Sequence, residues 1–123
     1  MSDYTPDRWM VLSIQTEREV IYKVFASWSS GGMMGTDSWK LNSGITRAVL
    51  SDNYWEFDGS SGSVYRCHKD YYGTNGYGQA VLNNLLSQAR TQGIKIEILD
   101  RDTDWASLPY DPLAQWIASG VKQ

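Results

Sequence analysis

Apolar and polar residues alternate over short stretches in the first half of the chain, a pattern that predicts strands. The clearest strand covers residues 20–28. One face carries Val20, Tyr22, Val24, Ala26 and Trp28, and the other carries Ile21, Lys23, Phe25 and Ser27. Both faces are largely apolar, so we expect this strand in the middle of a sheet. Further strands are predicted at 9–14, 38–42, 45–50, 54–58 and 63–68.

The periodicity changes in the second half. Apolar residues recur at helical spacing over 78–91, and Gly93 is placed to end this helix. Alternating isoleucines predict one more strand over 94–98. Asp111 followed by Pro112 is typical of a helix start, and predicts a short C-terminal helix that ends near Gly120.

These elements predict an α+β fold. Because the spacings between strands are short, antiparallel hairpins are favoured over parallel crossovers. We therefore expect a curved antiparallel sheet of about five to seven strands, with one main helix and a short C-terminal helix. No linker, repeat or low-complexity run divides residues 1–123, so a single globular domain is predicted.

Composition and charge exclude several classes of protein. One cysteine among 123 residues leaves no internal disulfide, and a net charge of −3 argues against holding duplex nucleic acid through its phosphates. No apolar run approaches the ~20 residues that span a bilayer, and the N-terminus lacks the features of a signal peptide. We expect a cytoplasmic protein that does not bind membranes.

Cysteine, histidine and metal chemistry can be tested by spacing. Cys67 and His68 are neighbours on a predicted strand, so their side chains point to opposite faces and cannot form a dyad within the chain. One His and one Cys are too few nitrogen and sulfur ligands for zinc. No cofactor is predicted.

Two groups of carboxylates remain candidates for chemistry. Asp100, Asp102 and Asp104 alternate as in a calcium loop, but Trp105 stands where that loop needs Gly. The sequence leaves open whether they bind a metal or form a solvated turn. Glu56 and Asp58, with Asp37 nearby, lie ~6.5–7 Å apart along a strand, a separation that a hydrolase could use and that solvent-facing acids also show.

Aromatic residues are unusually polar in type, since the chain has six Trp and eight Tyr but only two Phe. Trp and Tyr suit half-wet contact surfaces, and they are also good strand formers. The segment 29–35 (SSGGMMG) matches neither nucleotide-binding loop pattern. Its Met33 is predicted either as an adaptable contact or as a side chain folded back in a hairpin tip.

A mixed cluster of aromatic and basic residues follows. Arg66 and His68 share one strand face, and the next loop contains Lys69 and several tyrosines. Residues 59–95 hold four Lys or Arg against one acid, although the chain is acidic overall. The cluster fits an anion with a planar group or a protein hot spot, and a hairpin with exposed tyrosines is the plainer alternative.

Three blocks, 22–28 (YKVFASW), 37–45 (DSWKLNSGI) and 61–69 (SGSVYRCHK), resemble small uncharacterised proteins carried by phages and mobile elements. The resemblance implies a protein that acts by occupancy, inhibiting a host defence protein or sequestering its signalling nucleotide. It assigns no site residues.

The sequence as a whole predicts a non-enzymatic binding protein that occupies a host (defence) protein. One alternative is a protein that sequesters a nucleotide or cyclic-nucleotide signal in interface pockets of a homo-oligomer, and another is a small carboxylate-dependent hydrolase. The expected contact surface combines 65–77 with 29–39. Its predicted site residues are Trp28, Met33, Trp39, Arg66, His68, Lys69, Tyr71, Tyr72 and Tyr77.

Overall fold

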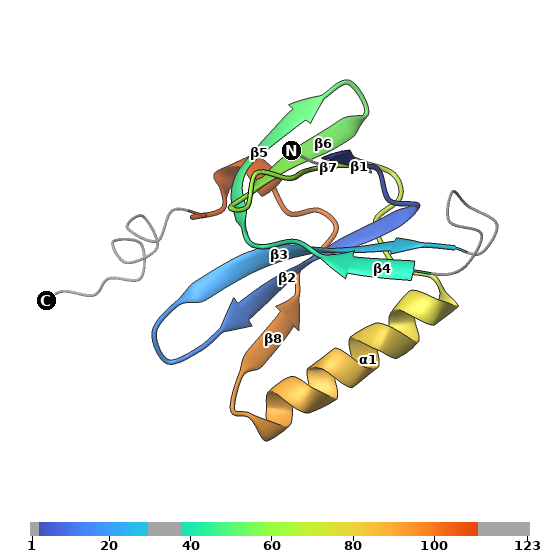
Figure 1. Ribbon diagram of the computed structural model, residues 1–123. Helices are drawn as coiled ribbons and strands as arrows, with labels where there is room; N and C mark the ends of the chain where they lie inside the picture. Colours follow the sequence, from blue (N-terminus) through green and yellow to red (C-terminus); the bar gives the residue numbers. More distant parts are fainter. Residues whose placement is uncertain (1–2, 30–37, 111–123) are drawn as a thin grey trace, which may run out of the picture.

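The computed structural model describes residues 3–29 and 38–110. Eight strands form two four-stranded sheets, and one long helix packs beside them (Figure 1). Sheet A has the order β1-β7-β6-β5 and sheet B the order β4-β3-β2-β8. The strands are β1 (Asp3–Tyr4), β2 (Arg8–Gln15), β3 (Val20–Trp28), β4 (Ser38–Leu41), β5 (Ile45–Ser51), β6 (Tyr54–Gly59), β7 (Val64–His68) and β8 (Lys95–Ile98). The helices are α1 (Gly76–Thr91) and the short 3-10 helix η1 (Trp105–Ser107).

The structure confirms the α+β class with one main helix, and it divides the strands between two sheets. The division occurs after β4, where Asn42 ends the strand by accepting the Val24 N–H on its side chain at 2.8 Å. Gly44 then adopts a φ of +140°, a conformation that favours glycine, and the chain enters sheet A at Ile45. The predicted C-terminal helix lies outside the described residues.

The position predicted for the strand at 20–28 is confirmed. Strand β3 pairs with β2 on one side and with β4 on the other, antiparallel in both cases. Val24 and Ala26 face the core between the two sheets, whereas Phe25 faces α1. The strand is therefore apolar on both faces because each face packs against another layer.

The core between the sheets is built around Trp9 of β2. This side chain is 1% exposed and lies 5.4 Å from the Phe57 ring and 5.6 Å from the Trp105 ring, between centroids. Its indole N–H donates to the His68 carbonyl at 2.7 Å, which ties sheet B to the end of β7. The polar part of a buried Trp is satisfied in this way.

Helix α1 covers the face of sheet B that points away from sheet A (Figure 1). It begins two residues before the predicted start because the Asn75 side chain accepts the Gly78 N–H. At the other end, Gly93 adopts a φ of +73° and Ile94 donates to the Ala89 carbonyl, as in a Schellman motif. The predicted role of Gly93 is confirmed.

In the part of the chain that the structure describes, no helix lies over the outer face of sheet A (Figure 1). Within the same residues, no helix combines the length and apolar character needed to cross a membrane. Among residues 3–29 and 38–110, no further layer covers the outer face of sheet A, and the candidate site lies at its edge.

Candidate functional site

Along strand β7, buried side chains alternate with side chains on the outer face. Tyr65 and Cys67 are buried in the core between the sheets, while Arg66 and His68 are half-buried on the outer face. Burial raises the pKa of the Cys67 thiol well above its ordinary value. The predicted separation of Cys67 and His68 onto opposite faces is confirmed, so they do not form a nucleophile and base within the chain.

The neighbouring strand β6 also presents polar and aromatic side chains on the outer face, opposite those of β7. Tyr54 lies opposite His68, and Glu56 lies opposite Arg66. The Arg66 Nε is 3.1 Å from a Glu56 carboxylate oxygen, and the guanidinium carbon lies 4.6 Å from the centre of the Tyr54 ring. The edge-to-face contact between Tyr54 and His68 spans 5.1 Å between centroids.

The turn after β7 brings Tyr71 back over His68. Asp70 donates its backbone N–H to His68 Nδ1 at 3.1 Å, and Tyr71 donates its own to the His68 carbonyl at 3.0 Å. The two rings stack with centroids 4.2 Å apart and an angle of 20°. On the far side of Tyr71, the Arg8 guanidinium carbon lies 5.7 Å from the ring centre.

These contacts form a continuous row of side chains, which we call the aromatic row. It consists, in order, of Arg66, Tyr54, His68, Tyr71 and Arg8. The row joins both sheets, because Arg8 opens β2 of sheet B and the other members come from β6, β7 and the turn that follows β7.

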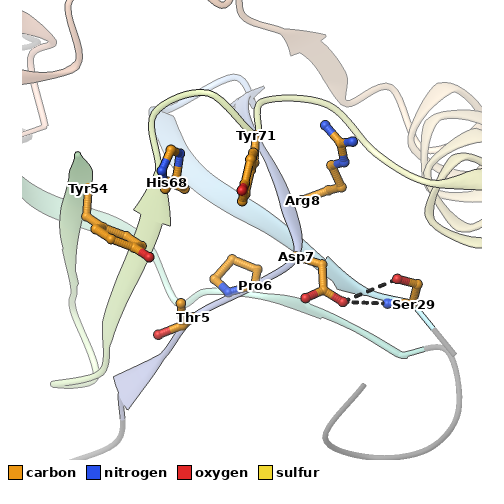
Figure 2. Close-up of a pocket in the computed structure, with 8 residues that line it drawn as sticks. All are labelled: Thr5, Pro6, Asp7, Arg8, Ser29, Tyr54, His68 and Tyr71. Atoms are coloured by element: carbon orange, nitrogen blue, oxygen red, sulfur yellow. Dashed lines mark hydrogen bonds between the residues drawn. The ribbon is translucent and has the colours of Figure 1, made fainter. Parts of the chain in front are cut away.

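A pocket of about 400 Å³ lies beside the row. Figure 2 shows Tyr54, His68 and Tyr71 on one wall and the segment Thr5, Pro6 and Asp7 on the other, with both phenol oxygens directed toward that segment. Asp7 is held in place by Ser29, which donates its backbone N–H at 2.9 Å and its hydroxyl at 3.3 Å to the same carboxylate oxygen.

The polar groups of the pocket include both donors and acceptors. Because His68 Nδ1 accepts the Asp70 N–H, the neutral imidazole carries its proton on Nε2. Within residues 3–29 and 38–110, Arg8 has no carboxylate at ion-pair distance. Asp7 adds one carboxylate oxygen that Ser29 leaves unused. The arrangement is suited to hold a planar ligand that has both acceptors and an N–H group.

The structure brings together three of the residues predicted for the site and places five others elsewhere, while Met33 lies outside the described residues. Arg66, His68 and Tyr71 belong to the aromatic row. Lys69 is exposed beside it and donates its backbone N–H to the Asn53 carbonyl. Trp28 borders the Thr5 segment, since its indole N–H donates to the Thr5 carbonyl at 3.1 Å.

Tyr72 is part of the core rather than the surface. Its hydroxyl accepts the Val11 N–H and donates to the Leu99 carbonyl, and burial raises its pKa to about 12. Trp39 stacks on Phe25 at the edge of sheet B, and Tyr77 is exposed on α1. Met33 lies outside the described residues.

The basic excess predicted over 59–95 does not form one patch. Arg66 pairs with Glu56, and Lys95 pairs with Glu97 at 3.4 Å. Arg90 lies in the last turn of α1, on the helix that covers sheet B. Lys69 is exposed beside the row, and Arg8, which was not among the predicted site residues, adds a positive charge at the pocket.

The two carboxylate groups are engaged locally. Glu56 and Asp58 each pair with an arginine on a neighbouring strand, Asp58 with Arg47 at 3.8 Å. Asp104 caps η1 by accepting the Ala106 N–H at 3.2 Å. Among the described residues, no cluster of three or more His, Cys, Asp or Glu side chains could hold a metal ion. Asp37 lies outside them.

Tyr54, Arg8 and Asp7 line the pocket but were not among the predicted site residues. A signal for Tyr54 was present, since pairing the predicted strands 54–58 and 63–68 as a hairpin puts it opposite His68. Arg8 and Asp7 had no local signal, because they reach the pocket only through packing of the two sheets. Comparison of the chain with protein-family models, curated proteins and solved structures finds no match.

Proposed function

We propose that this is a binding protein that acts by occupancy, without turning its ligand over, and that its contact site is the pocket with the aromatic row. The observation that carries the proposal is the row itself, in which four of the five side chains, drawn from both sheets, line one pocket. Aromatic and Arg side chains held rigidly beside a cavity are typical of binding sites.

The hydrogen bonds of the site support ligand binding rather than catalysis. His68 uses Nδ1 to fix its own turn, and Asp7 uses one oxygen to fix Ser29, so both groups are positioned by the fold. The carboxylates of the hydrolase alternative lie in two separate cross-strand ion pairs. That alternative therefore has no observation in its favour, whereas binding has the pocket.

The nature of the partner stays a prediction. The resemblance to phage-borne proteins suggests a host defence protein in the host cytoplasm, and Tyr and Arg are the residues that dominate protein hot spots. The same pocket would also take a small planar ligand, which is the simpler occupant to test.

The proposal is tested with a panel of small planar fragments that includes amines, carboxylic acids and phosphates. We expect some of them to shift the backbone amide NMR signals of Tyr54, His68 and Tyr71 in the full chain. Tyr71→Ala should abolish these shifts, because it removes the exposed ring of the row. Tyr77→Ala, which removes another exposed tyrosine that lies on α1 and does not line the pocket, is the matched control.

Two results would contradict the proposal. One is that no fragment shifts these signals. The other is that a bound fragment returns with a changed mass after incubation with the protein, which would identify an enzyme.

A further inference from the structure

The two ends of the aromatic row differ in how firmly their arginines are held. At one end, Arg66 lies 4.6 Å from the centre of the Tyr54 ring and is clamped by Glu56 at 3.1 Å. At the other end, Arg8 lies 5.7 Å from the centre of Tyr71 and has no carboxylate partner among the described residues. The Arg66 end of the row is thus fixed by an ion pair, and we call the Arg8 end, where the described residues form no such pair, the open end.

At the open end, a ligand can contact both a face of the Tyr71 ring and the charge of Arg8. Tyr71 is 47% exposed, and one of its faces is covered by His68. The Arg8 guanidinium lies over the other face and has no carboxylate partner among the described residues, so a planar ring can stack there if Arg8 moves aside. An arginine displaced in this way is well suited to pair with a phosphate carried by the same ligand.

Asp7 indicates which kind of aromatic ring a ligand of this pocket should have. Ser29 satisfies one of its oxygens, and the other can accept an N–H from a ligand in the pocket. Nucleobases carry such N–H groups on their edges, whereas the ring of a phosphotyrosine has none. The hydroxyls of Tyr54 and Tyr71, directed to the same side in Figure 2, add further hydrogen-bonding groups.

We propose that the pocket binds a free nucleoside monophosphate, with the base stacked on Tyr71, a base N–H on Asp7 and the phosphate on Arg8. This inference rests on the proposed function and names its ligand class. A single free nucleotide is favoured over a nucleic acid strand because the chain carries a net charge of −3 and the row supplies one uncompensated arginine.

The inference is tested by calorimetric titration of the full chain with adenosine monophosphate, adenosine and inorganic phosphate. The monophosphate should bind more tightly than adenosine by about tenfold, since a hydrogen bond to a charged group contributes that much. Arg8→Gln should remove this advantage, so that the monophosphate and adenosine bind the variant with equal affinity. Tyr71→Ala should weaken both ligands by about tenfold, because both lose the stacking contact.

Arg18→Gln is the matched control. It makes the same chemical change in the turn at the other end of β2 and should leave both affinities unchanged. Asp7→Asn keeps an acceptor for Ser29 but replaces the second carboxylate oxygen with an amide group. This variant should bind the monophosphates of adenosine, guanosine and cytidine more weakly.

The outcomes separate this inference from the proposed function. If monophosphate and nucleoside bind equally well, or if Arg8→Gln has no effect, the phosphate assignment is wrong. If a short single-stranded oligonucleotide binds more tightly than the monophosphate, the ligand is a strand and not a free nucleotide. If no nucleotide binds but planar fragments still shift the pocket signals, the inference fails and the binding function stands. If neither binds, both are wrong.

Discussion

Tyr72 shows how a single side chain completes the edge of a sheet. Its hydroxyl accepts the Val11 N–H at 3.2 Å and donates to the Leu99 carbonyl at 2.6 Å. Val11 lies in β2 just before the residues that pair with β8, so the phenol takes a position that strand backbone would otherwise occupy. The ring also packs against Trp9 at 4.8 Å between centroids.

Tyr72→Phe is expected to lower the free energy of unfolding by ~1–3 kcal/mol, because it leaves two backbone groups without a partner. Urea unfolding followed by tryptophan fluorescence measures this change. Tyr77→Phe removes the hydroxyl of an exposed tyrosine and should stay within ~0.5 kcal/mol of the parent protein. Equal stabilities for the two variants would show that the Tyr72 hydroxyl is not a structural partner.

The residues of the site differ in how far the sequence could predict them. Arg66 and His68 were predicted on one face because strand alternation is a local property. Tyr71 was selected only by its neighbourhood, and its stacking on His68 depends on the turn geometry at Asp70. Arg8 could not be predicted, since its place beside Tyr71 is fixed by a hydrogen bond between Trp9 and the Tyr71 carbonyl.

At the scale of elements, the start of α1 depends on close contact with sheet B. Gly78 is buried in the first turn of the helix. A Cβ at this position would overlap Thr74 Oγ1 and would lie 3.2 Å from the Ser27 Cβ of β3. The glycine thus lets the first turn approach both its capping loop and the sheet.

Gly78→Ala is expected to destabilise the protein by ~1–3 kcal/mol, the usual cost of overpacking. Helix propensity alone predicts the opposite sign, since Ala is better than Gly inside a helix by ~1 kcal/mol. Gly76→Ala is the control, because a Cβ there meets no atom within 4 Å. Thermal unfolding of both variants decides between the two effects, and a stabilised Gly78→Ala protein would contradict the packing argument.

Strands β2 to β8 and helix α1 were predicted within one or two residues of their observed ends, because periodicity and caps are local signals. The short elements β1 and η1 were not predicted. The order of strands was not predicted either. Strand β2 pairs with β8 from the far end of the described chain, and β1 pairs with β7 in parallel. Such pairings depend on which faces pack together, which periodicity along the chain does not encode.

The molecule as a whole uses its tyrosines in two distinct ways. Tyr54 and Tyr71 keep their hydroxyls at the pocket, whereas several others are packed inside the two-sheet core. Burial raises the pKa of Tyr65 and of Tyr72 to about 12, and it also raises the pKa of Tyr22 and Tyr110. The core therefore depends on phenols that stay protonated.

This distribution predicts alkaline destabilisation of the whole fold. In the unfolded chain these tyrosines ionise near their ordinary pKa of 10.0, while in the folded protein Tyr65 and Tyr72 stay neutral up to about pH 12. Between these values the unfolded state binds fewer protons, so the free energy of unfolding falls as pH rises. Each phenol that ionises only on unfolding contributes ~1.4 kcal/mol per pH unit, so we expect a decrease of ~2–3 kcal/mol per pH unit between about pH 10 and 12. The buried Cys67 thiol, whose pKa is raised well above 9.0, should add a shallower decline that begins near pH 9.

Urea unfolding at a series of pH values, with phenolate absorbance recorded in parallel, measures this dependence. Tyr72→Phe isolates one contribution, because it removes a buried phenol that resists ionisation in the folded state and cannot ionise after unfolding. Its free energy of unfolding is lower at neutral pH but should decline less steeply above pH 10 than that of the parent protein. Parallel declines in the two proteins would show that Tyr72 does not contribute to the alkaline transition, and that the other buried groups with raised pKa values govern it.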